Sequence, residues 1–146
     1  MNIEFLSTVA VIAPDPSQSS EFFVDVLGLP LKGQGSGYRH SEHVAGCKSF
    51  GIWPLSQVAE ACFGTPRWPK ERLVPQVSIE FDVADAAAVA SAAEELRQAG
   101  YELLHPPRTE PWGQTVARLQ SPEGVIVGIS FIPMFHDDMT ARENDP

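Results

Sequence analysis

Cysteine and basic residues are scarce in this chain of 146 residues, and long apolar runs are absent. Its two cysteines, Cys47 and Cys62, are too few and too irregularly spaced for a disulfide framework, so we expect two reduced thiols. Lysine and arginine total 10 against 19 acidic residues, a formal net charge of −9, which argues against nucleic acid as a partner because phosphate binding needs clustered cations. No apolar run reaches the length of a membrane span, and residues 1–5 show no leader pattern. We therefore expect a cytoplasmic protein without a membrane partner.

The chain contains the same short unit twice, about seventy residues apart. Residues 8–28 and 78–100 each have an alternating strand pattern, an Asp turn, an amphipathic helix pattern and a glycine. Strand-like segments follow each unit and end in a similar phrase, Phe50-Gly51-Ile52-Trp53 in one and Val127-Gly128-Ile129-Ser130 in the other. A repeat this long indicates two copies of one supersecondary module, which would enclose a cavity between them.

Hydrophobic periodicity and turn residues predict the elements of both modules. We expect helices at 17–27 and 86–99, with Phe22, Phe23, Val26 and Leu27 as the apolar stripe of the first. We expect strands at 5–13, 38–44, 47–54, 77–83, 101–104, 114–120 and 125–132. Residues 56–63 could form a short helix, but the rest of the stretch to residue 74 is predicted to be a loop.

In their order and spacing these segments resemble the vicinal oxygen chelate superfamily, which includes glyoxalase I, extradiol dioxygenases and bleomycin-resistance proteins. The matching motifs are Asp15, Phe22-Phe23, Val26-Leu27-Gly28, Asp85, Ala99-Gly100-Tyr101, Trp112-Gly113-Gln114 and Ser121-Pro122-Glu123-Gly124. The resemblance implies an α+β fold, in which two βαβββ modules form a cupped, barrel-like mixed sheet with helices on its outer face, and a homodimer. We place the domain at 1–133, with module one at about 5–55, a linker at about 56–75, module two at about 76–133, and an acidic tail at 134–146.

The resemblance also implies four positions for metal ligands, which are Thr8, Gly51, Ser78 and Gly128 in this chain. None of these side chains is a strong ligand for a divalent ion, so we predict no metal and no cofactor, as in the bleomycin-resistance-like branch. His40-Ser41-Glu42-His43 is the only tight cluster of ligand types. The two histidines would point to opposite faces of a strand, so we do not expect a metal there either.

Strand alternation predicts which charged side chains would line the cavity. If Ile79, Phe81 and Val83 take the helix side, then Ser78, Glu80 and Asp82 share the other face. In an ordinary antiparallel sheet these carboxylates would face water. In a cupped sheet Glu80 would bind a cationic or hydrogen-bond-donating ligand, or act as a catalytic base with a raised pKa.

Aromatic residues offer stacking planes for the same ligand. Trp53 shares a face with Gly51, which leaves room for a flat ring, although a Trp packed in the core is an equal alternative. The resemblance places Trp112 at the mouth of the groove. Thr8 and Ser78 would be wall residues, and Tyr38, with Arg39 and Arg118, is a further candidate.

We therefore predict a small-molecule-binding protein that holds an aromatic or cationic ligand in a cleft without a metal. It would sequester an antibiotic or carry a biosynthetic intermediate. Two alternatives stay open: a metal-dependent glyoxalase- or dioxygenase-like enzyme with a displaced metal site, and a metal-free lyase or isomerase with Glu80 as the base.

Overall fold

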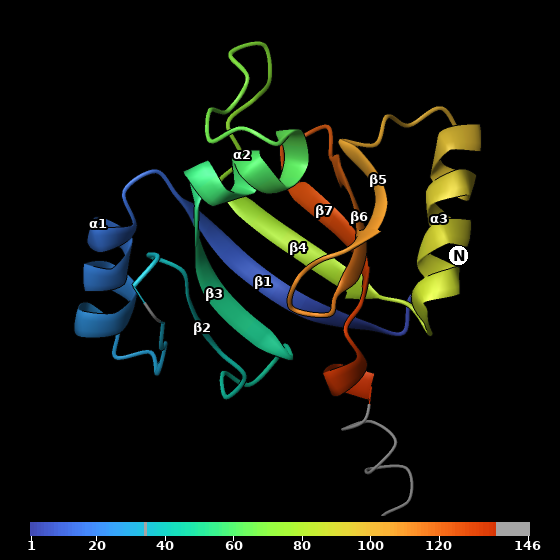
Figure 1. The fold of residues 1–146 in the computed structure, drawn as a ribbon. Helices are drawn as coiled ribbons and strands as arrows, with labels where there is room; N and C mark the ends of the chain where they lie inside the picture. The colour runs from blue at the N-terminus through green and yellow to red at the C-terminus, as the bar shows by residue number, and fades with distance from the viewer. Residues whose placement is uncertain (34, 137–146) are drawn as a thin grey trace, which may run out of the picture.

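A computed structural model describes residues 1–33 and 35–136 of the chain. Seven strands form one open mixed sheet in the order β2-β3-β1-β4-β7-β6-β5 (Figure 1). The elements in chain order are β1 (Phe5–Ala13), α1 (Pro16–Ser20), the π-helix η1 (Glu21–Val26), β2 (Arg39–Ser41), β3 (Ser49–Pro54), α2 (Leu55–Phe63), β4 (Val77–Asp82), α3 (Ala86–Gln98), β5 (His105–Thr109), β6 (Thr115–Gln120) and β7 (Ile126–Phe131). This confirms the α+β fold class. No helix in the described ranges is long and apolar enough to cross a membrane.

The two modules join through their first strands. β1 pairs with β4 in antiparallel orientation, and each also pairs in parallel with the last strand of its own module, β3 or β7. The two halves of the sheet are therefore related by an approximate two-fold axis between β1 and β4. Both modules of this sheet come from one chain, so the residues on either side of the axis lie on one continuous surface.

The two module helices cover the outer face of the sheet, the face that carries Ile52 and Ile129 (Figure 1). α3 confirms the prediction for 86–99: the Asp85 carboxylate accepts a hydrogen bond from Ala88 N at 2.7 Å, and Val89 packs in the core. Gly100 follows with φ +93°, a left-handed conformation that suits glycine after a helix.

The apolar stripe expected for the first helix is partly wrong. Phe23 packs beneath the helix, but Phe22, Val26 and Leu27 are more than half exposed. The cause is the π-helical hydrogen bonding of residues 21–26, which places more residues in each turn than an α-helix and rotates the buried side.

The short helix considered for residues 56–63 is present, whereas the strand expected at 101–104 is displaced. Residues 55–63 form helix α2, which packs on the inner face of the sheet, defined here as the face that carries Thr8, Ala10 and Glu80. The strand expected at 101–104 lies instead at 105–109, at the edge of the sheet. An edge position tolerates Pro106 and Pro107, since proline has no N–H to donate to a neighbouring strand.

Candidate functional site

A cavity of about 500 Å³ opens on the inner face of the sheet. Six residues proposed from the sequence line it: Thr8, Tyr38, Trp53, Glu80, Trp112 and Arg118. The wall also includes His40, Glu42, Ser49 and Gln114. The cavity therefore collects polar and aromatic side chains from both modules.

The polar base of the cavity is one row of residues across five strands. Arg118 of β6 lies beside Gly128 of β7, Gly128 lies beside Glu80 of β4, Glu80 lies opposite Thr8 of β1, and Thr8 lies beside Ser49 of β3. Paired residues in neighbouring strands point to the same side of a sheet, so this row faces the cavity as a unit. Gly128 is the one member without a side chain, and the Glu80 side chain lies over it.

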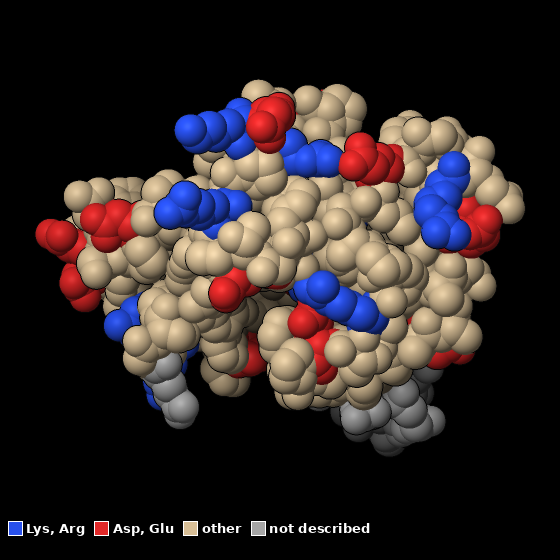
Figure 2. Space-filling model, turned by 45° about the horizontal axis from the view of Figure 1, so that its top comes forward, with Lys and Arg blue, Asp and Glu red and all other residues tan. Residues whose placement is uncertain are grey.

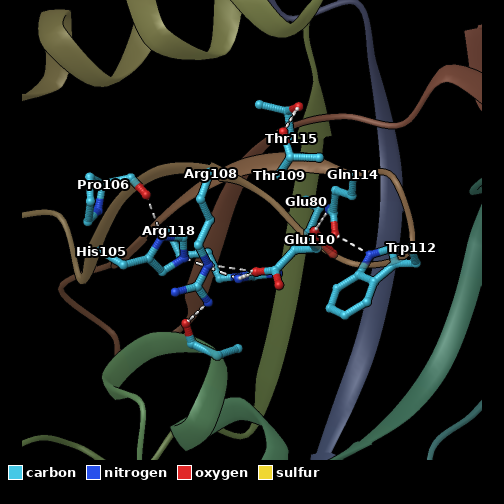
Figure 3. A network of polar contacts seen from close by, with 11 residues as sticks. Glu80, His105, Pro106, Arg108, Thr109, Glu110, Trp112, Gln114, Thr115 and Arg118 are labelled. Carbon is cyan, nitrogen blue, oxygen red and sulfur yellow. Dashed lines mark hydrogen bonds and ion pairs between the residues drawn. The ribbon is translucent and has the colours of Figure 1, made fainter.

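Glu80 is a buried carboxylate, with 7% of its surface exposed. Gln114 Nε2 donates to Glu80 Oε2 at 2.5 Å, and Trp112 Nε1 donates to Gln114 Oε1 at 2.8 Å (Figure 3). Gln114 Nε2 also donates to Ser130 Oγ at 2.9 Å. These contacts fix the orientation of the Gln114 amide and connect Glu80 to the indole at the cavity mouth. Burial raises the pKa of Glu80 above its usual value, against the opposing effects of Arg118 and Gln114.

The aromatic side chains take three different positions around the carboxylate. Trp53 is 9% exposed and belongs both to the cavity wall and to a core cluster with Val58 of α2. Trp112 is 61% exposed, which places it at the mouth. Burial, with the charges of Glu80 and Glu42, raises the pKa of Tyr38 to about 12, so its phenol stays protonated and can donate a hydrogen bond.

Ser78 and Asp82 share the inner face with Glu80, but the cavity wall does not include them. Ser78 lies opposite Ala10 and beside Ile126, where α2 covers the sheet. Asp82 is 0% exposed, and its Oδ2 accepts hydrogen bonds from Ile132 N at 2.8 Å and His136 Nε2 at 2.9 Å. Asp82 therefore anchors the segment after β7 and does not face a ligand.

The residues of the central row do not fit a divalent metal ion. In this sheet, the four ligand positions must lie side by side in one row of paired residues to converge on one ion. The row through Thr8 contains Ser49 and Glu80, in place of the Gly51 and Ser78 that the family resemblance implied. This correction adds one carboxylate, but hydroxyl groups and a glycine complete the set. His40 Nδ1 lies 3.0 Å from Glu42 Oε1 as a separate pair. Within residues 1–33 and 35–136, no group of three or more His, Cys, Asp or Glu side chains could hold a metal ion.

A second polar cluster, formed by His105, Arg108, Glu110 and Arg118, borders the cavity (Figure 3). Arg108 Nε and Arg118 Nη1 both donate to Glu110 Oε1, at 2.9 and 3.1 Å. Arg118 Nη1 also donates to His105 Nε2 at 3.1 Å, and the guanidinium carbon lies 5.3 Å from the centre of the Trp53 ring. Arg118 thus contributes a buried cation to the cavity.

Gln114 was not among the site residues proposed from the sequence, and Arg118 was named only as a possible wall residue. Arg118 could have been found as a charged residue between Ala117 and Leu119 in a predicted strand. Its pairing with Gly128 puts its side chain on the inner face. For Gln114 the signal was its place after Trp112-Gly113, where Gly113 adopts φ +91° in the turn that leads into β6.

On the face drawn in Figure 2, basic side chains are interspersed with acidic ones. The two thiols also offer little chemistry: burial raises the pKa of Cys62 to about 11, so it is protonated at neutral pH. The described site that best suits a small ligand is therefore the inner cavity.

Comparison with families and curated proteins gives one match. A family model described as the Glyoxalase/Bleomycin resistance protein/Dioxygenase superfamily matches residues 6–129. No curated protein matches the chain.

Solved structures share the fold at low sequence identity. A glyoxalase/bleomycin resistance protein/dioxygenase superfamily member from Vibrio splendidus is 18% identical, with a TM-score of 0.57 over 86% of this chain and 98% of that one. Methylmalonyl-CoA epimerase from Streptomyces coelicolor is 17% identical, with a TM-score of 0.53 over 88% and 97%. The Mn(II)-bound glyoxalase from Novosphingobium aromaticivorans is 18% identical, with a TM-score of 0.55 over 86% of this chain but 36% of that one. These similarities establish the fold and leave the function to the site.

Proposed function

Because the chain belongs to the Glyoxalase/Bleomycin resistance protein/Dioxygenase superfamily, we propose that it binds a small planar molecule in the Glu80–Trp53 cavity without a metal ion. The ligand would be cationic or rich in hydrogen-bond donors. The observation that carries the proposal is the position of Glu80, a buried carboxylate in a cavity with an indole wall. Sequestering an antibiotic and carrying a biosynthetic intermediate would both use such a cavity.

The physical argument rests on the cost of burying Glu80. A carboxylate in apolar surroundings loses hydration, and a cationic ligand would replace the lost water with a charge-assisted hydrogen bond. Trp53 would stack on the flat part of the ligand, and Tyr38 would donate its protonated phenol. The ligand would thus be recognised by one charge and one plane.

A metal-free lyase or isomerase is the second candidate function. The observation that favours it is the raised pKa of Glu80, since a carboxylate with a raised pKa is a better general base. The solved neighbours named above as a glyoxalase and an epimerase keep an enzymatic role open for this chain. Such an enzyme would consume its ligand, whereas a binding protein would release it unchanged.

Calorimetric titration with three indoles that differ in charge tests the proposal. Tryptamine carries an ammonium, tryptophol is neutral and indolepropionate is anionic. We expect tryptamine to bind most tightly, and Glu80→Gln to weaken its binding by about 1–3 kcal/mol, the value of a hydrogen bond to a charged group. Tryptophol should bind both proteins equally. The affinity for tryptamine should also fall as the pH drops through the raised pKa of Glu80, because protonation removes the charge.

Three controls accompany the titration. Trp53→Phe should weaken all three indoles while preserving the core position, and Glu94→Gln, on the exposed side of α3, should change nothing. Elemental analysis of the same preparation should find far less than one equivalent of zinc, iron, manganese or nickel. Equal affinity for the three indoles, or tryptamine binding that is indifferent to Glu80→Gln, would refute the proposed function.

A further inference from the structure

Arg118 has donor capacity that the chain itself does not use. The side chain is 1% exposed and lines the cavity, and its two polar contacts, with His105 and Glu110, both use Nη1. Its Nε is buried and has no hydrogen-bond partner within residues 1–33 and 35–136. Leaving a buried charged donor unpaired costs free energy, so a partner from outside the chain would be favourable.

The cluster around Arg118 holds two cations on one carboxylate. Arg108 and Arg118 share a single carboxylate, Glu110, through the same oxygen atom. Burial lowers the pKa of His105 to about 4, so this imidazole is neutral at pH 7. Within this cluster two guanidinium groups share one carboxylate. Arg118 is the member that faces the cavity, where Glu80, across Gly128, is its counter-charge.

The position of Arg118 relative to Glu80 determines which molecule could use both groups. The two residues occupy the same row, separated by Gly128, so their backbones are about 10 Å apart, or two strand spacings. Because Gly128 has no side chain, the Glu80 side chain lies over it: a Cβ there would be 3.3 Å from Glu80 Oε2. Trp53 lies against the Arg118 guanidinium, so a flat ligand would meet the indole wall beside both charges.

Building on the proposed function, we infer that Arg118 is an anion-binding subsite of the same cavity and that the ligand is a planar zwitterion. Its ammonium or other donor group contacts Glu80, and its carboxylate contacts the Nε–H of Arg118. The indole, phenol or similar ring that carries the two groups packs on Trp53. Arg118 thereby selects for an anionic oxygen that a purely cationic ligand lacks.

Tryptophan and tryptamine form a matched pair for this inference, since they differ only by the carboxylate. Wild-type protein should bind tryptophan about tenfold more tightly than tryptamine, as expected for one added charge-assisted contact. Arg118→Gln should abolish this advantage. Arg108 also pairs with Glu110 but does not line the cavity. Arg108→Gln should therefore preserve the advantage of tryptophan over tryptamine.

An NMR measurement on the native chain avoids any folding defect of the Arg118 variant. The Nε–H resonance of Arg118 should shift on addition of tryptophan or indolepropionate and should stay in place with tryptamine. Indolepropionate should bind the Glu80→Gln protein more tightly than wild type, because the repelling carboxylate is gone. Equal affinity of wild type for tryptophan and tryptamine, with an unmoved Arg118 resonance, would overturn the subsite.

The two proposals fail separately in this design. Tryptamine binding that depends on Glu80, without any advantage for tryptophan, would leave the proposed function standing and overturn the Arg118 subsite. The reverse outcome has two parts: indolepropionate binds the Glu80→Gln protein only when Arg118 is present, and tryptamine does not bind wild type. That outcome would overturn the proposed function and support an anion subsite at Arg118 alone.

Discussion

Burial of His105 gives the stability of this chain a dependence on pH. The imidazole Nε2 accepts from Arg118 Nη1 at 3.1 Å, and Nδ1 donates to Pro106 O at 2.7 Å, a pairing that requires the neutral ring. Burial lowers the pKa of His105 from 6.5 to about 4. Between these two values the unfolded chain binds a proton that the folded chain does not bind. The contribution to stability is therefore complete above about pH 6.5 and is lost as the pH falls toward 4.

His105→Gln should remove this part of the acid sensitivity. Glutamine does not titrate and can still accept from Arg118, whereas wild type should lose up to about 3 kcal/mol between pH 6.5 and 4, at about 1.4 kcal/mol per pKa unit. Urea unfolding at several pH values measures the difference between the two proteins. His43→Gln, at an exposed position, should follow wild type. Parallel stability curves for wild type and His105→Gln would contradict the prediction.

At the residue scale, alternation along β4 predicted the face of the sheet on which each side chain lies, but not which side chain reaches the cavity. Ser78, Glu80 and Asp82 lie on one buried face, as the pattern indicated, whereas Ile79 and Phe81 are only partly buried. Which of the three meets the cavity depends on what lies above each one: α2 over Ser78 and the segment after β7 over Asp82. Those covering segments are distant in the chain, so the periodicity of one strand carries no information about them.

At the scale of elements, β3 and β7 occupy equivalent places in the two modules, yet their glycines have different roles. Neither Gly51 nor Gly128 has a positive φ, so alanine is compatible with the backbone at both. A Cβ on Gly51 would lie 2.7 Å from the carbonyl oxygen of Arg39, on neighbouring β2. A Cβ on Gly128 would lie 3.0 Å from Glu80 Cγ and 3.3 Å from Glu80 Oε2. The first clash involves backbone and the second a side chain.

The two alanine variants should therefore lose different properties, stability in one and ligand binding in the other. Gly51→Ala should destabilise the fold by about 1–3 kcal/mol, the usual cost of overpacking, because the β2 backbone must move. Gly128→Ala should cost less stability but displace the Glu80 carboxylate from Gln114 and weaken tryptamine binding about tenfold, the value of one hydrogen bond. Thermal unfolding and calorimetry distinguish the two effects. Equal losses of stability, with tryptamine binding intact in Gly128→Ala, would contradict this assignment.

The elements that sequence patterns predicted best are those with local signals. α3 has an Asp cap, an alanine-rich body and a following glycine, and it forms within one residue of the expected range. β5 and η1 were misjudged because their form depends on distant contacts. Arg118 pairs with His105 to place β5 at the edge, and packing against Ile52 selects which side of η1 is buried.

For the whole molecule, α1 and α3 lie toward opposite sides of the sheet (Figure 1). Val9 and Val11 of β1 and Ile79 and Phe81 of β4 lie on its outer face at the central strand pair, and all four are only partly buried. Apolar side chains in the middle of a sheet are stabilised when another layer covers them. The homodimer expected from the family resemblance would supply that layer.

We therefore predict that the protein is a dimer at micromolar concentration, with an interface of more than about 1,000 Å², the usual minimum for a stable contact. Sedimentation velocity measures the association directly. Ile79→Lys should shift the protein to the monomer, since a lysine at the centre of the interface would lose its hydration without a partner. Tryptamine binding should survive in this variant, because Ile79 points away from the face that carries Glu80. A wild-type monomer would refute the dimer, and a dimer unaffected by Ile79→Lys would exclude this face as its interface. Tryptamine binding by the Ile79→Lys monomer would show that the cavity binds its ligand independently of assembly, as expected for a site built within one chain.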